Sequence, residues 1–146
     1  MDNYYIQLIF QLVLAVVLGA VIGLERERKG KEAGFRTYSL VTLGSCLFTI
    51  VSFELFGLVS GQAGISFDPS RVIQAIAIGI GFIGGGVIIY KQFHLEGLTT
   101  AAGLWCASAI GIAVGAKLYF LALTTVVLAA IILAVFGIVE RKIFKK

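Results

Sequence analysis

Glu54 is the clearest candidate for chemistry in this sequence, because it is a carboxylate inside an apolar segment. A charged side chain within hydrocarbon is costly and therefore marks a functional site by default. Asp68, Arg71 and Lys117 are expected at the same membrane level, with Gln74 one turn further along. Glu54 could pair with Arg71 or Lys117 and lock a helix bundle. It could instead form an outward cation or proton site with Asp68, or extend to the membrane interface.

A second polar group is predicted at the opposite membrane boundary, where apolar segments meet charged loops. Its members are Glu25, Arg26, Arg36, Thr37, Glu96, Thr99 and Thr100. Glu25 and Arg26 could pair with Arg36 or Glu96 across helices, which would give a structural or gating network. Anionic lipid headgroups would also be attracted to this basic rim.

The remaining reactive side chains do not form a catalytic set. The sequence shows no Ser/His/Asp arrangement, paired carboxylates or metal-ligand spacing, so we expect neither enzymatic activity nor a resident cofactor. Magnesium stays open as a ligand, and the identity of any metal is unknown. Cys46 and Cys106 lie inside apolar segments, which favours free thiols over a disulfide. Trp105, in the middle of a segment, is interpreted as a packing residue.

Residues 79–84 read G-I-G-F-I-G, which formally matches the G-x-G-x-x-G dinucleotide fingerprint. That fingerprint works when a strand delivers the glycines to a helix N-terminus, whose free N–H groups bind pyrophosphate. Here the glycines lie well inside an apolar segment with no preceding strand. We therefore exclude nucleotide binding and interpret the glycines as helix-packing residues.

The composition identifies the elements that must position these residues. Hydrophobic residues make up 59% of the 146-residue chain and charged residues 14%, against about 45–50% and about 25% in soluble domains. The mean hydropathy is +1.00. This composition predicts a multi-span membrane protein, so the lipid bilayer is its first partner. The first apolar run has no basic residue before it and no A-x-A-like cleavage site, so it is predicted to be a retained span.

Five segments approach the roughly 20 residues that cross a bilayer. They cover residues 4–24, 38–58, 69–90, 98–115 and 118–139. We therefore predict an all-α fold, a polytopic bundle of about five transmembrane helices that forms a single domain over residues 1–146. Asp68 and Pro69 are predicted to start the third helix, as its cap and its first helical residue.

The distribution of basic residues predicts the orientation. Ten of the 12 Lys and Arg residues lie on one side, namely Arg26, Arg28, Lys29, Lys31, Arg36, Lys91, Arg141, Lys142, Lys145 and Lys146. Only Arg71 and Lys117 lie on the other. The positive-inside rule then places the N-terminus outside and the C-terminus in the cytoplasm. Because this asymmetry explains the net charge of +4, we expect no nucleic-acid partner.

Small residues recur every four positions in three of the predicted spans. They are Gly19 and Gly23 in the first, Ala77, Gly81 and Gly85 in the third, and Gly103, Ala107, Gly111 and Gly115 in the fourth. In lipid, such spacing lets helix backbones approach closely. In the third span, Arg71, Gln74, Ile78, Gly81 and Gly85 are predicted to share one face toward a neighbouring helix.

Together these motifs resemble the MgtC/SapB family of bacterial membrane proteins over roughly residues 15 to 139. The motifs, in the family's order, are GAVIGLER (19–26), AGFRT (33–37), DPSR (68–71), GIGFIGGGVI (79–88) and EGLTTAAGLWCASAIG (96–111). The family positions carried over are Glu25, Arg26, Arg36, Thr37, Asp68, Arg71, Thr99, Thr100, Trp105 and Cys106. Some members have Asn at the position of Thr99, so a role that needs a carboxamide there is not carried over.

The resemblance implies an inner-membrane protein linked to low magnesium, acid tolerance and membrane-potential control. Within the family, MgtC is associated with inhibition of the ATP synthase. Many members carry a cytoplasmic ACT-like domain after the last span, whereas this chain stops at Lys146, so we expect the transmembrane domain alone. Functions of that domain are not transferred.

Three functional hypotheses follow from the sequence. The leading one is a regulator of ion or proton homeostasis that binds other inner-membrane proteins, such as the ATP synthase. The second is a small oligomeric transporter or channel for Mg²⁺ or protons, and the third is a structural scaffold. We also expect self-association, with a dimer as the leading arrangement, because the small-residue faces favour helix contact.

Overall fold

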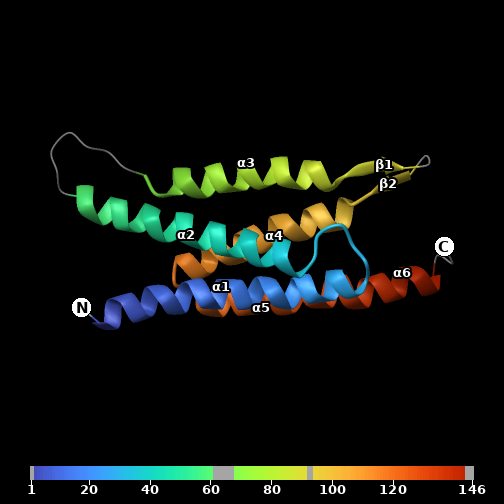
Figure 1. Ribbon diagram of the computed structural model, residues 1–146, viewed down its shortest axis with the longest axis horizontal. Helices are drawn as coiled ribbons and strands as arrows, with labels where there is room; N and C mark the ends of the chain where they lie inside the picture. The colour runs from blue at the N-terminus through green and yellow to red at the C-terminus, as the bar shows by residue number, and fades with distance from the viewer. Residues whose placement is uncertain (1, 61–67, 92–93, 144–146) are drawn as a thin grey trace.

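Five long helices dominate the computed structural model, which describes residues 2–60, 68–91 and 94–143 (Figure 1). They are α1 (Asp2–Arg28), α2 (Phe35–Val59), α3 (Ser70–Val87), α4 (Leu98–Gly115) and α5 (Tyr119–Ile131). The last continues through a π-helical turn, η1 (Ile132–Phe136), into α6 (Gly137–Ile143). Each of the five is long and apolar enough to cross a membrane, counting α5 with its extension. The chain is therefore a multi-pass membrane protein.

The helices lie roughly parallel to one long axis, which gives the bundle two ends (Figure 1). One end holds the start of α1, the end of α2, the start of α3 and the turn between α4 and α5, and we call it the Lys117 end. The other holds the end of α1 and the starts of α2 and α4, and we call it the Arg26 end. The N-terminus and the C-terminus of the chain lie at opposite ends.

Helices α1, α2 and α4 form the tightly packed core. A Cβ atom added at Gly19 of α1 would lie 2.6 Å from the Tyr38 carbonyl oxygen of α2, and one at Gly115 of α4 would lie 2.7 Å from the Cys46 carbonyl oxygen. Neither separation leaves room for a side chain. Gly23, Gly103 and Gly111 meet α2 or the residue just before it just as closely. In these helices the small residues bring backbones together within the chain.

The face of α2 that packs against these glycines carries polar side chains, most of them small. It runs along Tyr38, Thr42, Ser45, Thr49 and Ser52, all of them buried. The Thr42 hydroxyl donates to the Tyr38 and Ser39 carbonyl oxygens, and the Thr49 hydroxyl donates to the Ser45 carbonyl oxygen. Because the Thr42 and Thr49 hydroxyls bond within their own helix, they need no hydrogen-bond partner from a neighbour. The face therefore still allows close packing of another helix.

Helix α3 lies at the periphery and contacts mainly α4. Ile80 and Gly84 are its buried residues, and Gly84 packs against Ala101. The face predicted from the sequence, which includes Ile78, Gly81 and Gly85, is exposed, and a Cβ atom at either glycine would meet nothing within 4 Å. These residues share one face, but the neighbour expected for it is not part of this chain's described residues.

The ends of α3 differ from the sequence expectation. The helix begins at Ser70, after Pro69, and the Asp68 carboxylate accepts hydrogen bonds from the Ser70 amide and hydroxyl at 2.9 and 2.7 Å. It ends at Val87, earlier than the predicted span. Two short antiparallel strands follow, β1 (Ile89–Lys91) and β2 (His94–Glu96). The fold is helical apart from this hairpin, which an all-α prediction misses.

The turn between α4 and α5 is closed by backbone hydrogen bonds around Lys117. The Leu118 N–H donates to the Ala113 carbonyl at 2.8 Å, and the Lys117 N–H donates to the Val114 carbonyl at 3.0 Å. This is a Schellman motif, whose left-handed position usually holds glycine. Lys117 occupies that position with φ of +62°. A charged side chain is thus held over the end of α4 at an energetic cost.

Candidate functional site

Arg26 anchors a polar network at the Arg26 end, in which Arg26 and Thr100 are buried. Only 3% of this residue is exposed, although it lies in the last turn of α1. Its guanidinium donates to the Thr100 hydroxyl of α4 at 2.9 Å. The same hydroxyl donates to the Glu32 carboxylate, also at 2.9 Å. The Thr100 hydroxyl of α4 therefore links α1, through Arg26, to the α1–α2 loop, through Glu32.

Lys29 connects this network to the last membrane helix. Its ammonium forms an ion pair with Glu25 and donates to the Leu133 carbonyl at 3.0 Å. Leu133 lies in the π-helical turn η1, where backbone hydrogen bonding is irregular. We call Glu25, Arg26, Lys29, Glu32 and Thr100 the Arg26 network. It joins α1, α4, the α1–α2 loop and the extension of α5.

The charges of the Arg26 network balance, because two cations face two carboxylates. This balance and the hydrogen bond to Thr100 offset part of the cost of burying Arg26. Glu25 lies 3.8 Å from the Arg26 guanidinium, yet among the described residues its carboxylate oxygens accept no hydrogen bond of good geometry, and Arg26 Nε donates none. Because Glu25 Oε1 is paired with the Lys29 ammonium, the groups left without a hydrogen-bond partner in the described part of the chain are Glu25 Oε2 and Arg26 Nε.

Tyr38 closes the network against the core. Its side chain is fully buried, and its hydroxyl donates to the Thr100 carbonyl at 3.2 Å. Gly103, one turn further along α4, leaves the space that the Tyr38 ring and hydroxyl occupy. A small residue in one helix thus positions an aromatic residue of another, and together they fix the backbone that presents Thr100.

Two carboxylates of the α1–α2 region accept hydrogen bonds from backbone amides. The Glu32 backbone amide and the Thr100 hydroxyl both bond the Glu32 carboxylate and lower its pKa below the ordinary value. Glu27 accepts a hydrogen bond from the Phe35 amide at 2.7 Å, at the start of α2. Since Gly34 before that helix has no side chain to cap it, Glu27 supplies the missing acceptor.

Several residues expected in this network lie outside it. Arg36 and Glu96, the predicted partners of Glu25 and Arg26, are exposed and form no ion pair within the described part of the chain. Thr37 is partly buried and Thr99 is exposed, whereas the neighbouring Thr100 is buried. Only Glu25, Arg26 and Thr100 come together. The partners of the first two are instead Lys29 and Thr100.

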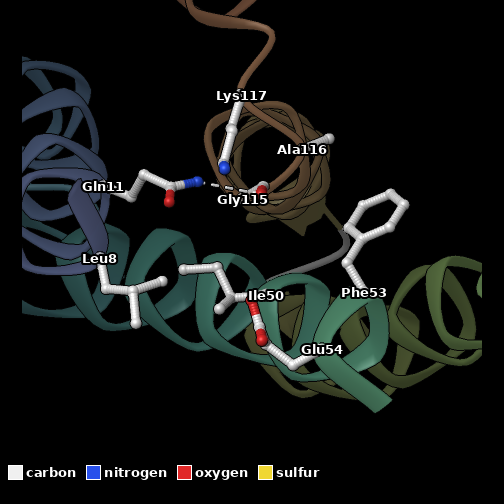
Figure 2. Close-up of a pocket in the computed structure, with 8 residues that line it drawn as sticks. All are labelled: Leu8, Gln11, Ile50, Phe53, Glu54, Gly115, Ala116 and Lys117. Carbon is white, nitrogen blue, oxygen red and sulfur yellow. Dashed lines mark hydrogen bonds between the residues drawn. The ribbon is translucent and has the colours of Figure 1, made fainter. Parts of the chain in front are cut away.

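The Lys117 end holds a pocket of about 280 Å³ between α1, α2 and the α4–α5 turn (Figure 2). Glu54 and Lys117 both line it, but the described residues show no ion pair between Glu54 and either Lys117 or Arg71. The ion pair that was one of the alternatives for Glu54 is therefore not formed among the described residues. Glu54 instead shares a side-chain hydrogen bond with Tyr4 of α1.

Gln11 forms the floor of this pocket and is completely buried. Its amide nitrogen donates to the Val114 and Gly115 carbonyls of α4 at 2.9 and 3.0 Å. These carbonyls belong to the last turn of α4, where the regular helical N–H partners run out, and the Val114 carbonyl also accepts from the Lys117 N–H of the turn. Its amide oxygen has no hydrogen-bond partner among the residues that the structure describes. Gln11 therefore caps α4 with one half of its amide and leaves the other half available.

The other predicted residues of this end stand apart from the pocket. Asp68 caps the start of α3, where the Ser70 hydroxyl and amide lower the pKa of its carboxyl group. Arg71 and Gln74 are exposed on α3. The predicted outward cluster is thus divided between a pocket with Glu54 and Lys117 and the exposed start of α3.

The mid-membrane motif also divides. Trp105 is 58% exposed, so more than half of its surface is left uncovered by the described residues. Cys106 is partly buried, and Cys46 is buried against the Gln11 carbonyl oxygen. Both thiols are free. Within the described residues, no group of three or more His, Cys, Asp or Glu side chains is placed to hold a metal.

Sequence reasoning missed the residues that complete both regions, namely Gln11, Lys29, Glu32 and Tyr38. Gln11 is the one signal that was available, because it is an amide side chain inside an apolar segment. Lys29 and Glu32 lie in a charged loop, where most side chains are solvated. Their roles depend on Leu133 and Thr100, which lie 104 and 68 positions away along the chain.

Comparison with known proteins gives a consistent picture. The MgtC family profile matches residues 12–142. The Escherichia coli K12 protein named "Putative magnesium transporter YhiD" is 38% identical over 140 residues, which cover 96% of this chain and 65% of that protein. Protein SrpB of Synechococcus elongatus is 41% identical over 127 residues, covering 82% of this chain and 69% of its own length. No solved structure matches the chain significantly.

Protein MgtC of Brucella abortus is 43% identical over 104 residues, which cover 71% of this chain and 40% of that protein. The chain thus spans just under two thirds of YhiD and a smaller part of this MgtC. The profile match includes every member of the Arg26 network, whereas Leu8 and Gln11, which line the pocket at the Lys117 end, precede it.

Proposed function

The chain belongs to the MgtC family, and on this premise we propose that it regulates ion or proton homeostasis in a bacterial inner membrane. It acts without catalysis, by binding other membrane proteins or a second copy of itself. Magnesium limitation, acid stress or changes in membrane potential are the conditions under which it works. The ATP synthase is one inner-membrane partner of this kind.

The open glycine face of α3 is the observation that carries this proposal. Gly81 and Gly85 meet no atom within 4 Å, whereas the glycines of α1 and α4 are in close contact with α2. In lipid, a face of small residues lets another helix approach until backbones touch. A partner helix from a second copy or another protein would pack against the open face of α3 as α2 packs against α4.

We propose that the Arg26 end faces the cytoplasm, with the N-terminus outside. The end of α1 and the start of α2 lie at one end of the bundle and the α4–α5 turn at the other (Figure 1). This supports the orientation, because the α1–α2 region carries Arg26, Arg28, Lys29, Lys31 and Arg36, whereas the α4–α5 turn carries Lys117. Topology reporters fused after residues 31 and 117 in cells test it. Cytoplasmic signal at 31 and external signal at 117 are expected, and the reverse pattern would invert the orientation.

Crosslinking tests the proposed contact. In a chain with Cys46→Ser and Cys106→Ser, a cysteine at Gly85 is expected to crosslink in membranes to itself or to one other protein. Val127 of α5 is 57% exposed and provides the matched control, because Val127→Cys is equally accessible to lipid. A crosslink of equal yield at both positions would show random collision and contradict the proposal.

A small oligomeric transporter for Mg²⁺ or protons is the second candidate. Glu54 lines a pocket without an ion-pair partner among the described residues, and the name of YhiD refers to magnesium transport. Since α1, α2 and α4 pack backbone to backbone, such a path would run between copies. Magnesium or proton flux into proteoliposomes that is lost in Glu54→Gln would favour transport, and absence of flux would favour regulation.

A further inference from the structure

We propose that the Lys117 pocket binds a zwitterionic group that carries a primary ammonium and a phosphate, as in the headgroup of an aminophospholipid. The Lys117 pocket is the space between Gln11, Glu54, Lys117 and the apolar side chains of Leu8, Ile50 and Phe53. This inference concerns binding at equilibrium, so it stands apart from whether the protein regulates or transports.

The first step is the unsatisfied oxygen of Gln11. A buried acceptor without a partner is destabilising and calls for a donor. The amide cannot be turned over, because its nitrogen donates to two carbonyl oxygens that an amide oxygen would repel. Figure 2 shows the amide oxygen on the side that faces Leu8 and Ile50. Whatever satisfies it must therefore enter the pocket and offer an N–H or O–H group.

The second step is the pair of opposite charges that do not meet. Lys117 and Glu54 both line the pocket, and Figure 2 shows the Lys117 ammonium near Gln11 and the Glu54 carboxylate near Ile50, on the α2 side. Neither has an ion-pair partner within the described part of the chain. The left-handed backbone of Lys117 is imposed by the Schellman turn, so its side chain starts from a fixed place over the end of α4. Strain held at one charged residue is typical of a functional position.

The third step is the choice of occupant. A metal cation would satisfy Glu54 and Gln11 but would be repelled by Lys117. A simple anion would satisfy Lys117 but would face a carboxylate and an amide oxygen. A zwitterion places an ammonium between Glu54 and Gln11 and an anionic group on Lys117, so the Gln11 oxygen gains a donor and both charges gain an ionic partner.

The position and size of the pocket point to a lipid headgroup. It lies at an end of the membrane helices, where headgroups are found, and Tyr4 and Tyr5 mark this level as aromatic interface residues do. Its volume of about 280 Å³ is below the range of roughly 300–1,000 Å³ for drug-sized ligands. It suits a headgroup whose glycerol or acyl part rests on Leu8, Ile50 and Phe53.

Lipid retention measured by native mass spectrometry tests the proposal. The purified protein is loaded from vesicles of phosphatidylethanolamine, phosphatidylcholine or phosphatidylglycerol. Phosphatidylethanolamine is expected to be retained at least tenfold more than either of the others. Phosphatidylcholine has the same phosphate but no N–H to donate, and phosphatidylglycerol has no ammonium.

Paired variants locate the site. Glu54→Gln and Lys117→Asn are each expected to abolish most of the preference, and asparagine tolerates the left-handed backbone at position 117. Asp68→Asn and Arg71→Gln make the same charge changes at the same end but outside the pocket, so they should leave it intact. Equal retention of the three lipids, or a preference unchanged in both pocket variants, would overturn the proposal.

Competition with a soluble compound shows whether the bound zwitterion is a lipid headgroup or a free molecule. Glycerophosphoethanolamine carries the same charges without acyl chains. If it displaces the bound lipid only at large excess, the lipid is the ligand. If it binds as tightly as the lipid, and Glu54→Gln weakens it equally, the recognised group is the same but the ligand is a soluble zwitterion. Thermal unfolding of each variant shows that it is folded.

Discussion

Helices α3 and α4 have the same length of 18 residues and the same richness in small residues, yet they have different surroundings. Nine residues of α4 are buried and only two of α3. The difference lies in the neighbour, because α4 meets the narrow polar face of α2 whereas α3 meets α4 along one side only. A repeated small residue shows that a helix can be packed closely, but not which helix packs there.

The same contrast separates the charged residues. Arg26 is buried beside α4 and bonds Thr100, whereas Arg71 is exposed on α3. Each cation stands near the end of a membrane helix, where the sequence alone treats them alike. The following predictions test whether contact with α4 is what makes a residue structural.

Replacement of Arg26 should have the largest effect. Arg26→Met removes a buried guanidinium together with its hydrogen bond to Thr100, which is expected to destabilise the fold by about 3 kcal/mol, because hydrogen bonds to charged groups are the stronger ones. Arg71→Met on α3 should change the free energy of unfolding by less than about 0.5 kcal/mol. Unfolding in detergent measures both. Similar losses in the two variants would remove the distinction.

Glycine substitutions give the next effect. A Cβ atom at Gly111 would overlap the Thr42 carbonyl and lie 2.8 Å from the Ser45 Cβ. Neither group can move freely, so Gly111→Ala should destabilise by about 1–3 kcal/mol. Gly81→Ala on α3 meets open space and should be neutral or stabilise the isolated chain by up to about 1 kcal/mol. If Gly81→Ala destabilises as much, the α3 face is already occupied under those conditions.

Lys117→Gly should stabilise the end of α4 by about 1 kcal/mol, because glycine adopts the left-handed backbone without the Cβ penalty. The control is Lys117→Ala, which removes the charge but keeps the Cβ atom and should bring no such gain. Thermal unfolding of the two variants separates backbone strain from charge. A gain in Lys117→Ala equal to that in Lys117→Gly would show that charge is the cause.

The smallest effect concerns Glu32. Its lowered pKa means that its ionised form stabilises the folded state above the ordinary carboxyl pKa, and this contribution is lost as the pH falls through the lower folded pKa. Unfolding measured from about pH 6 to about pH 3 should therefore show a weaker acid loss in Glu32→Gln. Glu96→Gln changes an exposed carboxylate of the same end and should keep the full acid loss.

Much of the architecture could be predicted from the sequence, because lipid imposes simple rules. Long apolar segments must form helices, so five spans emerged with ends within a few residues of those observed. The hairpin after α3 was missed because its strands are only three residues each. Such short strands carry no detectable period.

The sites were less predictable, because their partners are distant in the chain. Arg26 and Thr100 are 74 positions apart, and Gln11 and Gly115 are 104 apart. The sequence marks Glu25, Arg26 and Thr100 as a boundary group, but nothing in their spacing selects Thr100 over Thr99. Only the rotation of α4 against α1 decides which hydroxyl faces the guanidinium.

The sequence by itself determined that lipid surrounds the chain, how many helices cross it and which kinds of side chain lie at each end of the helices. These properties follow from hydrophobicity and segment length, which are local features. The tertiary structure decided which glycines a neighbouring helix packs against, which charges are paired and where the Gln11 amide oxygen is left without a donor. These properties depend on the relative rotation and depth of the helices. Small-residue ridges permit several such arrangements, and only complementary faces such as that of α2 select one.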